Sequence, residues 1–256
     1  MSESAKVTLT DSSRTPPVER VVHLLIADIS GFTQFIWAHR ESLAHAQLLI
    51  NDLLGAVLDQ ASPPFQIAKL EGDAVFFYLP CESAGSGERL ATAIPAFFES
   101  FRAKQKELAE GNLCHCSACT RIESLRLKVI LHRGTALFFS LGGFQELSGP
   151  DVITVHRLTK NSVASDQYLL ATAPAFEQVR FPAEMQFEAG EERYPDIGVV
   201  PVHLHFPEPR PEAQKTQRRS FGYRFGREWI KYVRTLPYRF GFRKVTLVRD
   251  ELDEKS

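Results

Sequence analysis

A chain of 256 residues with 44% apolar and 24% charged side chains has the composition of a globular protein that can bury a large core. Its net charge of −1 gives no overall electrostatic reason to expect nucleic acid or an anionic membrane as a partner. No apolar run reaches the roughly 18 residues of a membrane span, and the first residues lack the pattern of a secretory signal, so we expect a cytoplasmic protein.

Apolar periodicity predicts alternating strands and helices in the first half of the chain. A continuous apolar run is typical of a central strand, and apolar residues at helical spacing indicate an amphipathic helix. Pro95 is expected to bend the second helix unless it lies near the first turn. The predicted ranges are 21–27 for the first strand, 41–60 for the first helix, 65–80 for two strands around a turn at Glu71 and Gly72, 86–108 for the second helix and 125–134 for the fourth strand.

The second half of the chain predicts shorter elements and a biased tail. A further strand is expected directly after the fourth, then a helix and two more strands, with alternating Val and Leu of the last strand facing inward. These elements are residues 135–147, 150–163, 168–171 and 199–206. We therefore expect a flexible N-terminal arm over 1–18, one domain over 19–207 with a cysteine-rich loop at 112–121, and a basic, aromatic tail over 208–256.

The core order β-α-β-β-α-β is typical of an α+β fold, the ferredoxin-like four-stranded antiparallel sheet with both helices on one face. The later elements and the tail would form a C-terminal extension of it. In this topology the end of the first strand, the turn between the second and third strands, and the start of the fourth lie at one edge. Asp28 ends the first strand and Asp73 follows the turn, so we expect their carboxylates to be neighbours.

Two neighbouring carboxylates cannot both stay ionised without a large energetic cost unless a cation lies between them. Oxygen ligands in small number suit Mg²⁺ or Mn²⁺, which completes its shell with water and substrate phosphates. Taken singly, each acid has a plainer interpretation, Asp28 as the cap of the next helix and Asp73 as a hairpin-turn residue. Taken together, the two acids favour a metal site.

Four segments stand out in this context: "ADISGFT", "KLEGDAVFF", "LRLKVILHRG" and "GPDVITVHRL". The first two resemble the metal-binding opening and the second metal strand and turn of class III nucleotidyl cyclases. The third is similar to the strand before the dimerisation arm of that family, and the fourth, more loosely, to the helix that carries its transition-state residues. The resemblance covers about residues 20–165 and is closer still to an uncharacterised bacterial branch related to these cyclases.

The resemblance implies roles for the residues at matching positions. Asp28 and Asp73 would hold Mg²⁺ or Mn²⁺, assisted by the backbone carbonyl of Ile29. Arg157 would neutralise charge on the phosphates as the 3′-oxygen attacks, and a surface ion pair is the competing interpretation of this arginine. The residues that would lie beside the nucleotide are Gly31, Phe32 and Thr33.

The resemblance also implies a nucleotide base. Lys69 occupies the position of the base-reading lysine of adenylyl cyclases, and Glu146 stands where they have an aspartate. Adenine fits this pair, because its N1 accepts a hydrogen bond and its amino group donates one. The competing interpretations are an exposed strand lysine and a solvated loop acid. The implied reaction is the conversion of ATP to cyclic AMP and pyrophosphate, a lyase step in signal transduction.

One residue departs from the pattern of this family. Ile153 stands four residues before Arg157, where the family has an asparagine that orients the ribose. Loss of one positioning contact can lower turnover about a hundredfold, so the alternative is an inactive cyclase-like module that binds nucleotide or metal as a sensor or partner subunit. In the family, one subunit supplies the metal ligands and the other the base-binding and arginine residues. The resemblance therefore implies a head-to-tail homodimer with shared sites.

The loop "NLCHCSACTR" brings three thiols together, Cys114, Cys116 and Cys119, with His115 between them. Three thiolates on so short a loop can converge on Zn²⁺ if one further ligand completes the site. Cys81 is a poor fourth ligand, because the predicted topology puts it at the opposite edge of the sheet. A redox-active thiol cluster and unmetallated surface cysteines are the other interpretations.

The tail carries eleven basic and two acidic residues between positions 210 and 244, interleaved with aromatic residues. Such a segment can pack its aromatics on the domain, lie on an anionic membrane surface, or contact nucleic acid. We rank the three interpretations in that order, with nucleic acid the least favoured.

Overall fold

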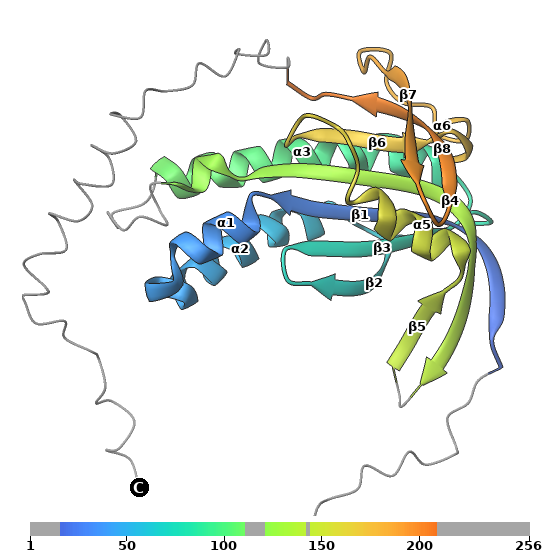
Figure 1. The fold of residues 1–256 in the computed structure, drawn as a ribbon, viewed down its shortest axis with the longest axis horizontal. Helices are drawn as coiled ribbons and strands as arrows, with labels where there is room; N and C mark the ends of the chain where they lie inside the picture. The colour runs from blue at the N-terminus through green and yellow to red at the C-terminus, as the bar shows by residue number, and fades with distance from the viewer. Residues whose placement is uncertain (1–15, 111–120, 142–143, 209–256) are drawn as a thin grey trace, which may run out of the picture. The chain divides into compact units, whose positions relative to one another are not determined.

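The computed structural model describes residues 16–110, 121–141 and 144–208, which form a mixed sheet with helices against it (Figure 1). The predicted α+β class is confirmed. In chain order the elements are β1 (Val18–Ser30), α1 (Phe32–Ala38), η2 (Arg40–Ser42), α2 (Leu43–Leu58), β2 (Gln66–Glu71), β3 (Ala74–Pro80), α3 (Ser86–Glu110), η3 (Ile122–Ser124), β4 (Arg126–Leu141), β5 (Phe144–Ser148), α5 (Pro150–Leu158), β6 (Tyr168–Thr172), α6 (Ala173–Phe176), β7 (Glu188–Tyr194) and β8 (Gly198–His205).

The strand order of the sheet is β2-β3-β1-β4-β6-β8-β7, and β5 pairs with β4 off this path. β1 runs antiparallel to both β3 and β4, and β2 runs antiparallel to β3, which is the predicted ferredoxin-like arrangement. The sheet then continues past β4, because β6 pairs with β4 in parallel and β8 and β7 follow in antiparallel order. The predicted four strands are therefore one half of a wider sheet.

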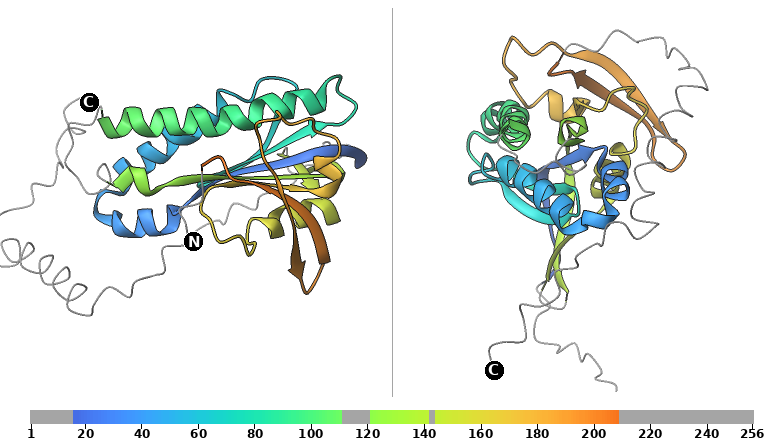
Figure 2. Two further views of the ribbon diagram at one scale, coloured as in Figure 1. Left: turned by 90° about the horizontal axis from the view of Figure 1, so that it is seen from above. Right: turned by 90° about the vertical axis from the view of Figure 1, so that its left-hand side faces the viewer.

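Both faces of this sheet are covered. The helices α2 and α3 pack together on one face, as predicted, and α5 lies on the other face (Figure 2). Successive side chains of a strand point to opposite faces, so β1 contributes alternate residues to the two cores. Leu25, Ala27 and Ile29 belong to the core under α2 and α3, and Val22, Leu24 and Ile26 to the core under α5.

The predicted break between residues 134 and 135 is wrong, because β4 is one long strand. β1 extends far enough to pair on both sides of that point, with Val22 opposite Gly134 and Val21 opposite Thr135. Gly134 therefore stands inside the ladder. An aspartate side chain from the start of α5 occupies the space that a Cβ at Gly134 would fill.

The helix predicted over 150–163 is shorter, since α5 ends at Leu158. Its last carbonyls bond to side chains instead of continuing the helical pattern. The Leu158 carbonyl accepts from Asn161 Nδ2 at 2.7 Å, and the Thr159 carbonyl accepts from Lys128 Nζ at 3.2 Å. Side chains that satisfy the free carbonyls at a helix end stabilise that end. By contrast, α3 runs uninterrupted through Pro95.

Several predictions fall on residues that the structure does not describe. They concern most of the N-terminal arm, the cysteine cluster of Cys114, Cys116 and Cys119, and the tail after residue 208. Cys81 is described: it directly follows β3, at the end of that strand opposite to Asp73, as predicted. In the described part of the chain, no helix has the length and apolar character needed to cross a membrane.

Two leucines of α2 provide a test of this packing. Leu53 is fully buried between the helix and the sheet, whereas Leu48 on the same helix is exposed. We expect Leu53→Ala to lower the free energy of unfolding by about 2–5 kcal/mol, since it leaves a cavity in a packed core. Leu48→Ala is the matched control and should change it by less than about 0.5 kcal/mol. Urea denaturation measures both, and equal effects would contradict the described helix face.

Candidate functional site

The end of β1 and the β2–β3 hairpin bring Asp28 and Asp73 together. The Ile29 amide donates a hydrogen bond to the Asp73 carbonyl at 3.0 Å, which ties the strand to the turn. Gly72 supplies the positive φ of +67° that this tight turn requires. Register pairs Asp28 with Ala74, the residue directly after Asp73, so the two acids lie at the same corner of the sheet. Their meeting follows the predicted topology, and their role as metal ligands stays a prediction.

The surroundings of Asp73, including Asp28, shift its pKa. Burial, and then the negative charge of Asp28, raise the pKa of Asp73 from 3.8 to about 6, and the positive charge of Lys128 acts in the opposite direction. A carboxyl group with such a pKa keeps part of its proton near neutral pH. The site therefore has more negative charge than its own residues neutralise, and it favours an added cation.

Asp28 does not serve as a helix cap. The N-cap of α1 is Gly31, with φ of +87°, and no side chain caps this helix. The next residue, Phe32, packs against the core under α2 and α3, and Thr33 is exposed. Contact of these three residues with a nucleotide stays a prediction.

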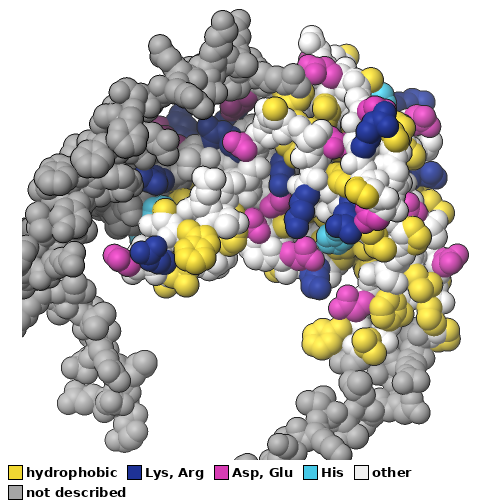
Figure 3. All heavy atoms as spheres, in the orientation of Figure 1, with side chains coloured by type: hydrophobic (Ala, Val, Ile, Leu, Met, Phe, Trp, Pro, Cys, Tyr) yellow, Lys and Arg dark blue, Asp and Glu magenta, His cyan; other side chains and the backbone are white. Residues whose placement is uncertain are grey.

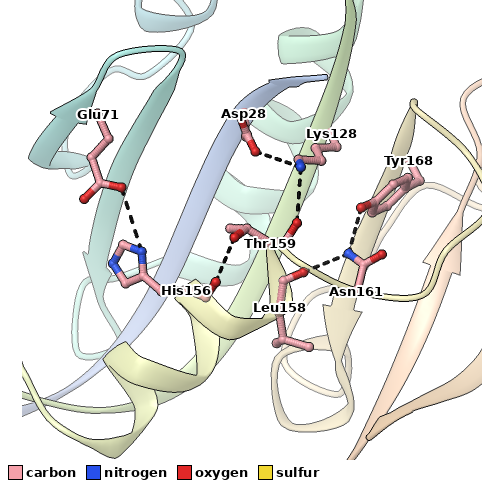
Figure 4. A network of polar contacts seen from close by, with 8 residues as sticks. All are labelled: Asp28, Glu71, Lys128, His156, Leu158, Thr159, Asn161 and Tyr168. Carbon is pink, nitrogen blue, oxygen red and sulfur yellow. Dashed lines mark hydrogen bonds and ion pairs between the residues drawn. The ribbon is translucent and has the colours of Figure 1, made fainter. Parts of the chain in front are cut away.

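Lys128 is the residue of this site that sequence reasoning missed. Register places it opposite Asp28 on one side and opposite Tyr168 on the other, so the three side chains line one face of the sheet. Its Nζ lies 2.8 Å from Asp28 Oδ2 and donates to the Thr159 carbonyl (Figure 4). The signal was present in the sequence, because Lys128 interrupts the apolar run from Leu127 to Leu131 at the start of a strand that begins at the same edge as Asp28.

Tyr168, which lies opposite Lys128 on the neighbouring strand β6, attaches the sheet to the loop after α5. The Tyr168 hydroxyl accepts a hydrogen bond from Asn161 Nδ2 at 2.7 Å (Figure 4). Burial is the main cause that raises the pKa of Tyr168 to about 12, and the Asp28 charge adds to it. Tyr168 therefore stays a neutral phenol at any physiological pH.

Arg157, near the end of α5, forms an ion pair in its own chain. Its guanidinium lies 2.7 Å from Asp196 Oδ2, in the turn between β7 and β8, and both side chains are about half exposed. This is the surface ion pair that we gave as the competing interpretation. Ile153, one turn earlier, is 53% exposed, so an apolar side chain faces solvent where the family has a polar one. The contact of Arg157 with phosphate stays a prediction.

The strand β7 holds the chain that follows α5. Glu192 is buried and accepts hydrogen bonds from both the amide and the hydroxyl of Ser162, at 3.0 and 2.9 Å. Two residues on, the Tyr194 hydroxyl donates to the Lys160 carbonyl at 3.4 Å. Because side chains two apart on a strand share a face, Glu192 and Tyr194 both reach the chain that follows α5. Sequence reasoning did not find this contact.

The start of α5 is held as firmly as its end. Asp151 Oδ2 accepts from the Thr135 amide at 2.7 Å, and Oδ1 pairs with His132 Nε2 at 3.0 Å. The other ring nitrogen of His132 bonds to the Thr172 hydroxyl at 2.9 Å. A Cβ at Gly134 would lie 2.1 Å from the Asp151 carboxyl carbon, so only glycine fits there. These contacts fix the start of α5 on the sheet, at the opposite end of the helix from the Lys128 contact.

The remaining predicted residues lie on β2 and β5, which approach each other. Lys69 is exposed on β2, and Glu146 is half-buried on β5, opposite Phe139 of β4. Two residues after Lys69, Glu71 Oε2 lies 3.9 Å from His156 Nδ1 of α5 (Figure 4). The structure thus brings both predicted base-binding residues onto neighbouring elements of one chain. Whether they bind a base stays a prediction.

The hairpin of β4 and β5 projects from the body of the domain (Figures 1 and 2). Its tip carries apolar side chains in solvent, and Figure 3 shows hydrophobic atoms gathered along this hairpin. Phe144 is 72% exposed and Leu141 is also exposed. Exposed apolar side chains that gather in one place are typical of a surface that another protein covers.

The donor set at the acid pair fits a small divalent ion. Among the described residues, no group of three or more His, Cys, Asp or Glu side chains could hold a metal ion. Mg²⁺ does not require such a group, because it binds through one or two carboxylates and completes its octahedral shell with water and substrate phosphates. Asp28 and Asp73, with the backbone carbonyl of Ile29, match this pattern.

The fold is that of class III nucleotidyl cyclase catalytic domains. The structure is similar to the guanylyl cyclase Cya2, with a TM-score of 0.59 and 12% identity over 78% of this chain and 98% of that one. The adenylyl cyclase CyaB from P. aeruginosa gives 0.57 and 14%, over 77% and 98%. A guanylate cyclase domain from Catenaria anguillulae in complex with GTP gives 0.55 and 16%, over 73% and 97%.

In sequence, two further similarities cover the middle of the chain. Residues 50–168 match a family described as "Protein of unknown function (DUF2652)". The uncharacterized protein Rv2561/Rv2562 of Mycobacterium tuberculosis is 33% identical over 120 residues, which are 47% of this chain and 55% of that protein. This chain therefore spans little more than half the length of the curated relative that it matches.

The raised pKa of Asp73 makes a prediction about stability. The protonated carboxyl stabilises the fold below about pH 4, and this contribution is lost as the pH rises through about 6, the folded-state pKa. The metal-free protein should therefore lose stability between about pH 5 and 7.5 relative to Asp73→Asn, which carries no titrating group there. Melting temperatures measure the difference, and parallel pH profiles would contradict it.

Mn²⁺ should act on the same equilibrium in the opposite sense. Because the ion competes with the proton for Asp73, it should raise the melting temperature more at about pH 7.5 than at about pH 5. Asp73→Asn is the control, and its melting temperature should respond weakly to Mn²⁺ at both pH values.

Proposed function

We propose that this chain is a nucleotidyl cyclase that converts ATP to cyclic AMP and pyrophosphate at sites shared by two copies. The observation that carries the proposal is the meeting of Asp28 and Asp73 with uncompensated negative charge, at the end of the central strand of a cyclase fold. The solved relative from Catenaria anguillulae holds GTP, which makes a nucleoside triphosphate the natural ligand to test.

In this proposal the 3′-oxygen of ATP attacks the α-phosphorus, the bond to the β-phosphate oxygen breaks, and pyrophosphate leaves. Divalent ions, when bound, supply activation of the 3′-hydroxyl and neutralisation of the leaving group. Asp28 and Asp73 bind those ions, and the Ile29 carbonyl assists them. Arg157 of the second copy exchanges its Asp196 ion pair for the phosphates and stabilises the charge that develops there.

Lys69 and Glu146 select the base. The lysine ammonium donates to N1 of adenine, and the glutamate accepts from the exocyclic amino group. The approach of β2 and β5 within one chain supports a joint role for the two residues. The exposure of Lys69 supports a site that closes only when a second copy covers it.

The projecting β4–β5 hairpin supports a homodimer as the active form. Its exposed Leu141 and Phe144 would be buried against the second copy, which removes apolar surface from water. In such a dimer each site takes its acids from one copy and its arginine and base-binding residues from the other.

The activity is tested by incubating the purified protein with Mn²⁺ and each of the four nucleoside triphosphates. We expect cyclic product from ATP, and a loss of at least about a hundredfold in turnover for Asp73→Ala, which removes a metal ligand. Asp166→Ala, at an exposed acid, is the matched control and should keep wild-type turnover. Product from no nucleotide, with the protein folded, would contradict the proposal.

Shared sites make a separate prediction. Asp73→Ala and Arg157→Ala should each be inactive alone, but a mixture of the two should recover about a quarter of wild-type turnover. Half of the dimers are then mixed, and each mixed dimer has one of its two sites intact. Measurement of cyclic product before and after mixing checks this. A mixture as inactive as its components would place both residues in the same site of one chain.

Two observations favour a binding module without turnover as the second candidate. Ile153 offers no hydrogen bond to a ribose, and Arg157 is already paired with Asp196. Such a module would bind ATP in calorimetry with Mg²⁺ present and yield no cyclic product. Calorimetry beside the product assay separates the two candidates.

A further inference from the structure

Lys128 is a charged side chain inside the sheet. Its neighbours on β4, Leu127 and Val129, are fully buried, and its own side chain is only 18% exposed. Asp28, its partner at 2.8 Å, is 15% exposed. A largely buried ammonium needs a specific partner to offset its desolvation, and here the partner is one of the two candidate metal ligands.

The charges at this point do not balance. One ammonium faces two carboxyl groups, and its short contact is with Asp28 alone. A dication beside the same oxygens would neutralise both acids, but it would then stand close to an ammonium of like charge.

We propose that Lys128 is the resident counter-cation of the acid pair, and that a divalent ion binds to Asp28 and Asp73 by displacing the Lys128 ammonium from Asp28. Lys128 thereby sets the affinity of the site for metal. The inference rests on the proposed function only in taking Mg²⁺ or Mn²⁺ as the ligand, and it requires no turnover.

Displacement of Lys128 from Asp28 would also affect the end of α5, because Lys128 makes a second hydrogen bond there. Lys128 also donates to the Thr159 carbonyl, directly after the helix and two residues beyond Arg157. While Lys128 bonds to both partners, it links the acid pair to the end of α5. Displacement breaks that link at Asp28 and leaves Lys128 on the carbonyl alone. Metal occupancy in a chain therefore acts on the helix end that carries its own arginine.

The first test compares the Mn²⁺ affinities of wild type, Lys128→Met and Lys160→Met by isothermal titration calorimetry. Lys128→Met removes the competing charge and should bind Mn²⁺ about tenfold more tightly or better. Lys160→Met removes the same charge from an exposed position of the following loop and should bind like wild type, because solvent and salt screen it. Affinity of Lys128→Met equal to or below that of wild type overturns the inference.

A second measurement uses the wild-type chain, in case Lys128→Met does not fold. Acetylation by a water-soluble anhydride is followed by mass spectrometry with and without Mg²⁺. Lys128 should be modified several times faster when Mg²⁺ is bound, since its ammonium has left Asp28, whereas the rate at Lys160 should not change. A rate at Lys128 that is the same or lower with saturating Mg²⁺ overturns the inference.

These readouts are separate from the cyclase assay. If wild type binds no Mn²⁺ and Lys128→Met does, the inference is supported and the proposed activity is contradicted. If neither protein binds Mn²⁺, both are overturned. If wild type makes cyclic product and Lys128→Met binds Mn²⁺ no more tightly, only the inference fails.

Discussion

Coverage of β1 on both faces is the constraint on which the rest of the structure depends. The strand lies in the middle of the sheet, between β3 and β4, with α2 and α3 on one side and α5 on the other. A strand with helices packed on both faces can carry a charged side chain only near the end of that packing, where water or a partner group can reach it. Asp28 stands at that point, and the hairpin with Asp73 is tied to it by a backbone hydrogen bond. The packing of the core around β1 therefore determines where the candidate site lies.

The chemistry of the site comes from charge that the fold leaves partly unbalanced. Asp28 has the Lys128 ammonium as a close partner, whereas burial and the charge of Asp28 raise the pKa of Asp73. Lys128 also bonds to the carbonyl of Thr159, directly after α5. Asp151 attaches the start of α5 to β4, and Glu192 attaches the chain after α5 to β7. A change in the charge of Asp28 would therefore act, through Lys128, on the end of α5.

The sequence was informative where the determinant is local. The apolar run of β1, the helical spacing of α2 and α3 and the turn at Gly72 predicted the half-sheet and the meeting of Asp28 and Asp73. Errors arose where a distant partner decides the outcome. Gly134 resembles a strand end until Asp151 is known to occupy the space above it. The end of α5 depends on Lys128, about thirty positions away. The Arg157 ion pair depends on Asp196, which lies in the turn after β7, a strand that the sequence did not predict.

The contacts of β7 bear on how this chain acquires its structure. Glu192 and Tyr194 of β7 hold the segment after α5, yet they lie 30 and 34 positions further along the polypeptide than their partners. During synthesis Asp28 and Asp73 emerge before α5, whereas Glu192 and Tyr194, which hold the chain after that helix, emerge later than it does. Because contacts between residues far apart in sequence form more slowly than local helices, we expect the contacts that secure the chain after α5 to form late in folding.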